Sequence, residues 1–297
     1  VGKTDLAIAL SREIESEIIS VDSVQVYKKL EIGSGKPSKK TLLKYPHKLL
    51  SLIEPWEPYS TALFVIDSTK EIDLCYQSKK LPILAGGTML YFRSLLNGIS
   101  RMPQADQTIR SEIVKEAKKK GWEHLHERLS KIDPESALRI HSNDTQRIQR
   151  ALEVYLISSK TMSEWRKGNK DGELLTSHDV LQFAIEPENR EILRRDIKNR
   201  FLRMLEEGLV AEVERLLKIR EMDSSKTSMR SVGYRQVCDY LADRISYEEM
   251  VTRAINASRQ LAKRQMTWLR GWKNLNWITQ DNEVSVDLIK KKLKILE

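Results

Sequence analysis

The first ten residues of the sequence, VGKTDLAIAL (Val1–Leu10), contain the stretch that decides the fold. Gly2-Lys3-Thr4 matches the end of the phosphate-loop pattern G-x-x-x-x-G-K-[S/T], in which a glycine-rich turn joins a strand to a helix. Apolar residues then recur at helical spacing over residues 4–14, so a helix is expected directly after the loop. Backbone N–H groups at such a helix start, with the charge of Lys3, favour phosphate binding, and the Thr4 hydroxyl is a candidate Mg²⁺ ligand. The alternative is an ordinary helix start capped by Thr4.

The composition indicates a soluble globular protein with an acidic partner. The chain has 297 residues, 40% of them hydrophobic, which is enough for a sizeable core. It contains no run of 18 apolar residues, so no membrane span is expected. Its two cysteines, Cys75 and Cys238, lie far apart and in no metal-binding spacing, which favours the reducing cytoplasm. The net charge of +9 favours a nucleic-acid partner; the alternative is a basic protein without one.

Strands alternate with helices on both sides of a helical middle region. Residues 17–23 (EIISVDS) are predicted as a strand, and residues 83–85 as a buried strand that leads through Gly86-Gly87 into a helix. Residues 179–185 are predicted as a further strand, followed by a helix over 186–208. This alternation predicts an α/β fold, a P-loop NTPase-like parallel sheet flanked by helices. Ligands of such sheets bind at the carboxyl ends of strands, where Asp22 and Gly86-Gly87-Thr88 fall.

The middle of the chain has a different sequence pattern from the regions on either side. Residues 104–160 are charged, helical in pattern and poor in β-branched runs, which indicates a helical insertion, and residues 167–177 are predicted as a polar linker. We therefore predict a core of residues 1–102 and 161–277 that includes C-terminal helices, an insertion of residues 103–160, and a tail of residues 278–297. The tail is expected to be a weakly patterned helix or a frayed end.

Asp22 could have either of two roles, and its position in the sequence does not decide between them. A carboxylate at a strand end beside a phosphate loop is suited to act as a general base or to bind a metal. An Asp directly after a strand also commonly caps the following helix.

The segment 253–272 (RAINASRQLAKRQMTWLRGW) is the most polarised of the sequence. Its apolar residues form a helical stripe, and most of its basic residues lie off that stripe, where they could follow a phosphate backbone. Trp268 or Trp272 could stack on a base. A second basic segment, QRIQR, spans residues 146–150. The alternative is a solvated helix face whose tryptophans belong to the core.

Seven segments taken together resemble one family, the bacterial tRNA dimethylallyltransferases, also called tRNA isopentenyltransferases. The segments are VGKTDLAIAL, ISVDSVQVYK, IGSGKPS, LAGGTMLYFRSLL, RALEVYLIS, SVGYRQV and RQLAKRQMTWLRGW. They keep the order of the family and span the chain from Val1 to about Trp277.

The resemblance implies a reaction. Members of this family transfer a dimethylallyl group from dimethylallyl diphosphate to N6 of the adenosine that is 3′-adjacent to the anticodon, in tRNAs that read codons beginning with U. Their phosphate loop, often described as ATP-binding, holds the donor's diphosphate. By this resemblance Gly2, Lys3, Thr4 and Arg200 bind the diphosphate, Thr4 with Mg²⁺, and Asp22 is the general base. A cytoplasmic monomer is expected.

The resemblance also implies contacts with the anticodon stem-loop of tRNA, and the insertion resembles a mobile domain that closes on this stem. The positions that match the family's tRNA contacts are Asp22, Ser23, Val24, Gln25, Thr88, Arg110, Gln146, Arg147, Ile148, Gln149, Arg150, Arg230, Ser231, Val232, Gly233, Tyr234, Arg235, Lys263, Arg264, Gln265, Met266, Thr267, Trp268, Leu269 and Arg270.

The sequence departs from the family pattern before Val1, where the family has a strand, the first loop glycine and a threonine near the reaction. We therefore expect a chain that starts at Val1 to bind the donor weakly or not at all and to lack a strand at the centre of its sheet. Two rival functions stay open. A small-molecule kinase would explain the loop and Asp22 but not the basic helix, and a non-catalytic RNA-binding module would bind tRNA without turnover.

Overall fold

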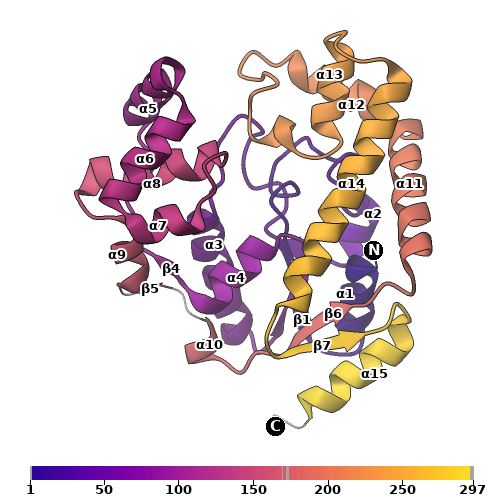
Figure 1. Ribbon diagram of the computed structural model, residues 1–297. Coiled ribbons are helices and arrows are strands. Elements are labelled where there is room, and N and C mark those ends of the chain that lie inside the picture. Colours follow the sequence, from indigo (N-terminus) through magenta and orange to yellow (C-terminus); the bar gives the residue numbers. More distant parts are fainter. Residues whose placement is uncertain (1, 169, 172–173, 295–297) are drawn as a thin grey trace. The chain divides into compact units, whose positions relative to one another are not determined.

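The computed structural model describes residues 2–168, 170–171 and 174–294, and the chain divides into two compact units (Figure 1). The larger unit consists of residues 1–95 and 177–297, and the smaller unit of residues 96–176. The smaller unit contains all of the segment 103–160. The predicted linker 167–177 and tail 278–297 fall partly on residues outside the described ranges.

A three-stranded parallel sheet lies at the centre of the larger unit, in the order β2-β1-β3. Strand β1 (Ser16–Val21) pairs with β3 (Leu81–Gly86) from Ser16↔Leu81 to Val21↔Gly86, and with β2 (His47–Lys48). Ile18, Ile19 and Val21 of β1 are at most 2% exposed, as expected for a central strand that is covered on both faces. The predicted strands at 17–23 and 83–85 are thus present. The prediction that the second of them is buried is wrong: all six residues of β3 are half-buried, since β3 pairs only with β1 among the described strands.

A second parallel pair consists of β6 (Gln182–Ile185) and β7 (Leu275–Ile278). Strand β6 was predicted as part of 179–185, whereas β7 was not predicted. Its four residues follow Asn274, whose φ of 57° makes a left-handed turn after the long helix that precedes it. The predicted tail contains a capped helix, α15 (Asn282–Leu293), whose first turn donates N–H groups to the Asp281 side chain.

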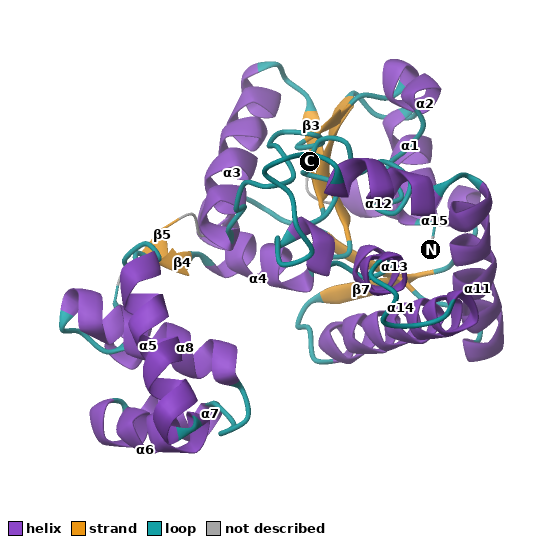
Figure 2. Cartoon of the chain, turned by 90° about the horizontal axis from the view of Figure 1, so that it is seen from above, coloured by secondary structure: helices purple, strands orange, loops and turns teal. Residues whose placement is uncertain are grey.

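Helix α1 (Lys3–Ser11) packs against residues of both parallel sheets, which explains its apolar residues on more than one face. Leu6 and Leu10 pack with α15, while Ala7 and Ile8 pack against Ile18 of β1. Figure 2 shows α1 on one side of the β1–β3 sheet and α3 (Thr61–Gln77) on the other. The sheet is therefore flanked by helices, as the sequence predicted.

A second core of the larger unit lies around Tyr27 and Tyr234, each at most 1% exposed. Its helical contributors are α11 (Arg190–Glu206), α12 (Leu209–Leu217), the 3₁₀ turn η1 (Ser228–Arg230), α13 (Tyr234–Leu241) and α14 (Tyr247–Arg270). Long α14 carries the polarised segment identified in the sequence. The larger unit also contains α2 (Lys39–Lys44) and most of α4 (Met89–Asn97), which runs into the smaller unit.

The smaller unit is a helical bundle that also contains a short antiparallel pair, β4 and β5. Its core includes Leu125, Leu129, Ile148 and Leu152, all fully buried. Its elements are β4 (Ile99–Ser100), α5 (Gln107–Lys120), α6 (Trp122–Ile132), α7 (Pro134–Arg139), α8 (Thr145–Ser158), α9 (Met162–Lys167), β5 (Lys170–Asp171) and α10 (Leu174–Ser177). Among the described residues of either unit, every helix is too short or too polar to serve as a membrane span.

Candidate active site

The carboxyl ends of β1 and β3 are held together by a tight backbone contact. A Cβ on Gly86 would lie 2.0 Å from the carbonyl oxygen of Val21, so this position admits only glycine. The N–H groups of Gly87 and Thr88 both donate to that same oxygen at 3.2 Å. Thr88 Oγ1 in turn accepts from the N–H of Ser23 at 3.0 Å. The segments after the two strands therefore form one connected edge.

Asp22 lies at this edge, and its predicted role as a general base or metal-binding group stays a prediction. Its Oδ1 accepts hydrogen bonds from the N–H of Val24 (2.8 Å) and of Gln25 (3.3 Å), so it caps a turn rather than a helix. Its Oδ2 accepts none from the described part of the chain. Burial raises the pKa of this carboxyl, against the lowering by its two N–H partners and by Lys3 and Arg200. One oxygen thus anchors the turn while the other is available to take a proton.

Lys3 begins α1 directly after Gly2, whose φ of 80° is the left-handed conformation. Its side chain reaches solvent, and its Cε lies 3.9 Å from the place of a Cβ on Gly87. Desolvation by the surrounding protein lowers the pKa of Lys3; Asp22 raises it and Arg200 lowers it. The ammonium therefore stands between the two strand ends, within the electrostatic field of Asp22.

Arg200 reaches the same region from α11. Its guanidinium has room there because residue 35 is a glycine: a Cβ at Gly35 would lie 2.0 Å from Arg200 Nη2. The φ of Gly35 is 63°, a second reason for glycine there. Two cations, Lys3 and Arg200, and one carboxylate, Asp22, thus converge from three separate segments of the larger unit, beside the N-terminus of α1. Such a group can bind a polyanion and accept a proton next to it.

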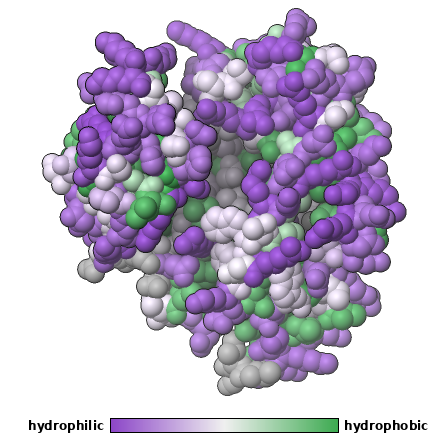
Figure 3. All heavy atoms as spheres, viewed as in Figure 1, coloured by the Kyte–Doolittle hydropathy of each residue, from purple (hydrophilic) through white to green (hydrophobic). Residues whose placement is uncertain are grey.

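The basic helix α14 borders this group. Gln265 Nε2 donates to the carbonyl oxygen of Gly87 at 2.7 Å, which ties the helix to the turn after β3. Lys263, Arg264, Thr267, Trp268 and Arg270 are exposed, and hydrophilic residues prevail over this helix in Figure 3. The guanidinium of Arg93 lies 5.7 Å from the Trp268 ring. Trp268 is therefore a partly exposed aromatic surface rather than a core residue.

The predicted segment from Arg230 to Arg235 divides into exposed and buried parts. Arg230 and Arg235 are exposed, Ser231 and Val232 are half-buried, and Gly233 and Tyr234 are buried. The Tyr234 side chain is fully enclosed in the core, so it has no surface for a tRNA contact. The accessible charges of this segment belong to Arg230 and Arg235.

In the smaller unit, Arg110, Gln149 and Arg150 gather around a buried acid, Glu153. Arg110 Nε and Arg150 Nη1 donate to opposite oxygens of Glu153 at 2.8 and 2.7 Å, and Gln149 Nε2 donates to the Arg110 carbonyl. Burial opposes ionisation of Glu153, but these arginines and the Asp106 N–H outweigh it and lower its pKa. Both arginines keep part of their side chains exposed.

The remaining positions of QRIQR differ in exposure. Gln146 and Arg147 are exposed, whereas Ile148 is a core residue of the bundle. Sequence reasoning missed Glu153, although its place within the apolar run RALEVYLIS is the signal, since a buried acid requires partners.

No group of three or more His, Cys, Asp or Glu residues suited to a metal ion occurs among the described residues. Thr4 lies in the first turn of α1, and its hydroxyl makes no hydrogen bond within the described chain. A lone hydroxyl suits Mg²⁺, which keeps several waters and relies on substrate phosphates for further ligands.

Comparison with known proteins matches residues 25–272 to the model of the IPP transferase family. The tRNA Δ(2)-isopentenylpyrophosphate transferase of Staphylococcus epidermidis is 31% identical, with 100% of this chain and 96% of that chain covered and a TM-score of 0.70. The Bacillus halodurans enzyme is 30% identical over 99% of this chain and 93% of that chain, also with a TM-score of 0.70. A eukaryotic dimethylallyltransferase acting on tRNA shares the fold, with 24% identity, a TM-score of 0.76, and 94% and 71% of the chains covered.

The family match covers most of the chain, and the similarity to the Staphylococcus epidermidis structure covers all of it. The P-loop-like α/β fold and the family resemblance drawn from the sequence are both confirmed. The chain is a member of the IPP transferase family, whose bacterial representatives among these structures are tRNA isopentenylpyrophosphate transferases.

Proposed function

We propose that this protein transfers a dimethylallyl group from dimethylallyl diphosphate to N6 of the adenosine 3′-adjacent to the anticodon, in tRNAs that read codons beginning with U. One observation carries the proposal. A chain of the IPP transferase family brings Lys3, Arg200 and Asp22 together at the ends of β1 and β3. The two cations suit the donor's diphosphate, and the carboxylate suits the acceptor's amine.

Lys3, Arg200 and the start of α1 bind the diphosphate of the donor and stabilise it as a leaving group. The C–O bond between the allylic carbon and the diphosphate breaks, and the leaving group takes the bonding electrons. Preorganised cations and backbone N–H groups stabilise the charge that develops on that oxygen. Thr4 would hold Mg²⁺ together with the diphosphate, where the ion neutralises further charge. The allylic carbon can bear positive charge, so screening of the leaving group makes ionisation easier.

Asp22 removes the proton from the amine of the acceptor adenosine. The lone pair of the exocyclic amine forms the new N–C bond, and the amine must then lose a proton. Asp22 Oδ2 takes that proton, while Oδ1 stays bound to the N–H groups of Val24 and Gln25. The raised pKa makes this carboxylate a stronger base than an exposed aspartate, and Lys3 and Arg200 help to keep it ionised at neutral pH.

The tRNA would be bound by exposed basic residues of both units. In the larger unit these include Lys263, Arg264 and Arg270, with Trp268 as a stacking surface; in the smaller unit they include Arg147. An adenine must leave its stack to reach a donor held beside Lys3, and unstacking costs a few kcal/mol that pocket contacts offset. A tRNA substrate would place this reaction in the cytoplasm.

The test separates this proposal from the two rivals. The protein is incubated with Mg²⁺, labelled dimethylallyl diphosphate and unmodified tRNA, and in parallel with labelled ATP and small-molecule acceptors. Label in the tRNA supports the proposal. ATP-dependent phosphorylation without label in tRNA favours a kinase, and tRNA binding without turnover in either assay favours a non-catalytic RNA-binding protein.

A further inference from the structure

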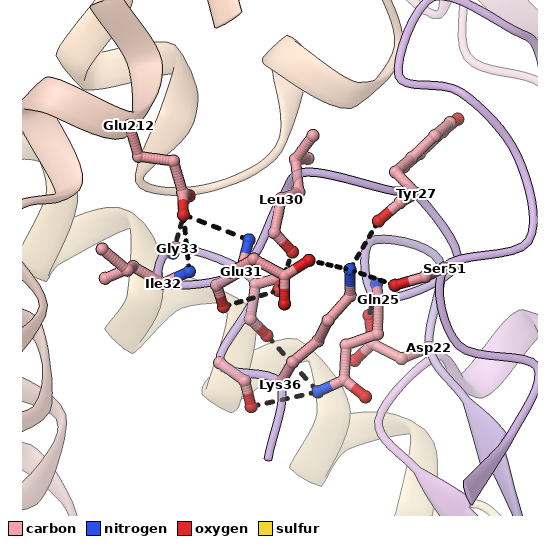
Figure 4. A network of polar contacts seen from close by, with 12 residues as sticks. Asp22, Gln25, Tyr27, Leu30, Glu31, Ile32, Gly33, Lys36, Ser51 and Glu212 are labelled. Atoms are coloured by element: carbon pink, nitrogen blue, oxygen red, sulfur yellow. Dashed lines mark hydrogen bonds and ion pairs between the residues drawn. The ribbon is translucent and has the colours of Figure 1, made fainter. Parts of the chain in front are cut away.

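The loop of residues 31–36 (EIGSGK) is fixed by a buried carboxylate; it overlaps the segment IGSGKPS, which resembles the family but has no role assigned above. Glu212 of α12 is only 4% exposed and lies on the helix face that also buries Val213 and Leu216. Its Oε2 accepts from the N–H of Glu31 (3.1 Å) and Ile32 (2.8 Å), and its Oε1 from the N–H of Gly33 (3.3 Å; Figure 4). Three successive backbone donors therefore close around one side chain.

Tyr234 extends the same arrangement by one residue. Its hydroxyl donates to Glu212 Oε1 at 2.6 Å and accepts from the N–H of Ser34 at 3.1 Å. The ring lies so close to Gly33 that a Cβ there would be 2.6 Å from it. All four N–H groups from residue 31 to residue 34 are thus bound by two side chains from a different part of the sequence.

Lys36 secures the far end of the loop. Its side chain is 1% exposed, and its Nζ donates to the carbonyl oxygen of Tyr27 (2.6 Å), to Ser51 Oγ (2.8 Å) and to Glu31 Oε1 (3.1 Å). Figure 4 shows Lys36 and Glu212 on opposite sides of the loop. An anion and a cation therefore hold the loop from its two sides.

Between these two attachments lies Gly35, the residue that contacts Arg200. Its carbonyl oxygen accepts from Gln25 Nε2 at 3.2 Å, and Gln25 is also the residue whose N–H binds Asp22. The loop fills the space beside the guanidinium so closely that a Cβ on Gly35 would overlap it. A shift of the loop would therefore move Gly35, which contacts the Arg200 guanidinium.

We propose that Glu212 is a positioning residue for the reaction, which acts through the loop of residues 31–35 to set Arg200 for the donor diphosphate. This inference rests on the proposed function. A glutamine cannot replace the carboxylate, because each of the two oxygens accepts from backbone N–H groups and an amide nitrogen would face one of those donors. Loss of the Glu212 contacts would leave the N–H groups of Glu31, Ile32 and Gly33 without their shared acceptor.

The test is a double-mutant cycle in the protein, with prenyl transfer to tRNA as the assay. Glu212→Gln should lower kcat/KM for dimethylallyl diphosphate by roughly ten- to a hundredfold, since small misplacements of a binding group have such effects. The dissociation constant for tRNA should stay within about twofold. In an Arg200→Ala background the same substitution should change kcat/KM less than about twofold, because coupled residues are not additive. Glu214→Gln, on the same helix but paired only with exposed Lys218, is the matched control.

Two results would overturn the inference. One is an equal loss from Glu212→Gln with and without Arg200, and the other is a loss confined to tRNA affinity. If Glu212→Gln fails to fold, Tyr234→Phe enters the same cycle, since it removes one hydroxyl and keeps the carboxylate. Absence of prenyl transfer by the unsubstituted protein would refute the proposed function instead, so the two failures are distinguishable.

Discussion

Gln265 Nε2 donates a 2.7 Å hydrogen bond to the carbonyl oxygen of Gly87, and so joins residues that are 178 positions apart in the sequence. A Cβ on Gly87 would lie 2.7 Å from that nitrogen. The contact holds the basic helix α14 against the turn where β3 ends, beside Lys3. The helix predicted to bind nucleic acid therefore lies against the end of β3, next to the residue that is predicted to bind phosphate.

Gln265→Ala is expected to lower the free energy of unfolding by about 1 kcal/mol, the usual net value of one such hydrogen bond. The melting temperature should fall by a few degrees. Gln260→Ala is the control, since it removes the same side chain type from an exposed position of the same helix. Equal stability changes in the two variants, measured by thermal denaturation, would contradict a structural role for the Gln265 contact.

Asp22→Asn is expected to slow prenyl transfer by roughly 10²–10⁴, the usual contribution of a general base. The amide oxygen can still accept from the N–H groups of Val24 and Gln25, so the turn is kept. Binding of tRNA should stay within about tenfold. Single-turnover transfer at a near-normal rate would show that Asp22 serves only as a cap.

The same substitution should stabilise the fold at neutral pH. Burial raises the folded-state pKa of Asp22 above its ordinary value of 3.8, so the folded protein binds this proton more readily than the unfolded chain does. The wild-type protein therefore loses stability as the pH rises from 3.8 through the folded-state pKa. Asp22→Asn should melt at a higher temperature than wild type at pH 7 and show no such advantage below pH 3.8. A lower melting temperature at pH 7 would refute this reasoning.

Binding of tRNA should weaken steeply with salt. The chain has a net charge of +9, and exposed basic residues lie on α8 and α14. If six phosphates are contacted, log K should fall with log salt at a slope of roughly −4 to −5. Fluorescence titrations at several salt concentrations give this slope, and a value near zero would remove the nucleic-acid role from these segments.

Much of the fold could be predicted because its signals are local. The strands β1 and β3 are short apolar runs that end in Asp22 and Gly86, and β6 precedes a helix with a clear pattern. Strand β7 could not be predicted, since its four residues carry no alternation and depend on pairing with β6. Many core residues of both units recur at helical spacing in the sequence, so they can be predicted without knowing which helix they pack against.

The site was less predictable because its groups meet through tertiary contacts. Lys3 and Asp22 were recognised from motifs, and Arg200 only from the family resemblance. Nothing in the sequence indicates that Gly35 makes room for Arg200, or that Glu212 binds a loop nearly 180 residues earlier. The one available signal is a charged residue on the apolar face of a helix, which Glu212 and Glu153 share.

Mass spectrometry of tRNA after reaction with dimethylallyl diphosphate tests the central claim most directly. A tRNA that reads codons beginning with U should gain one dimethylallyl group on the adenosine 3′-adjacent to its anticodon. The same tRNA with guanosine at that position should gain none. A dimethylallyl group on another nucleotide, or no group on either tRNA in the presence of Mg²⁺, would contradict the proposed function.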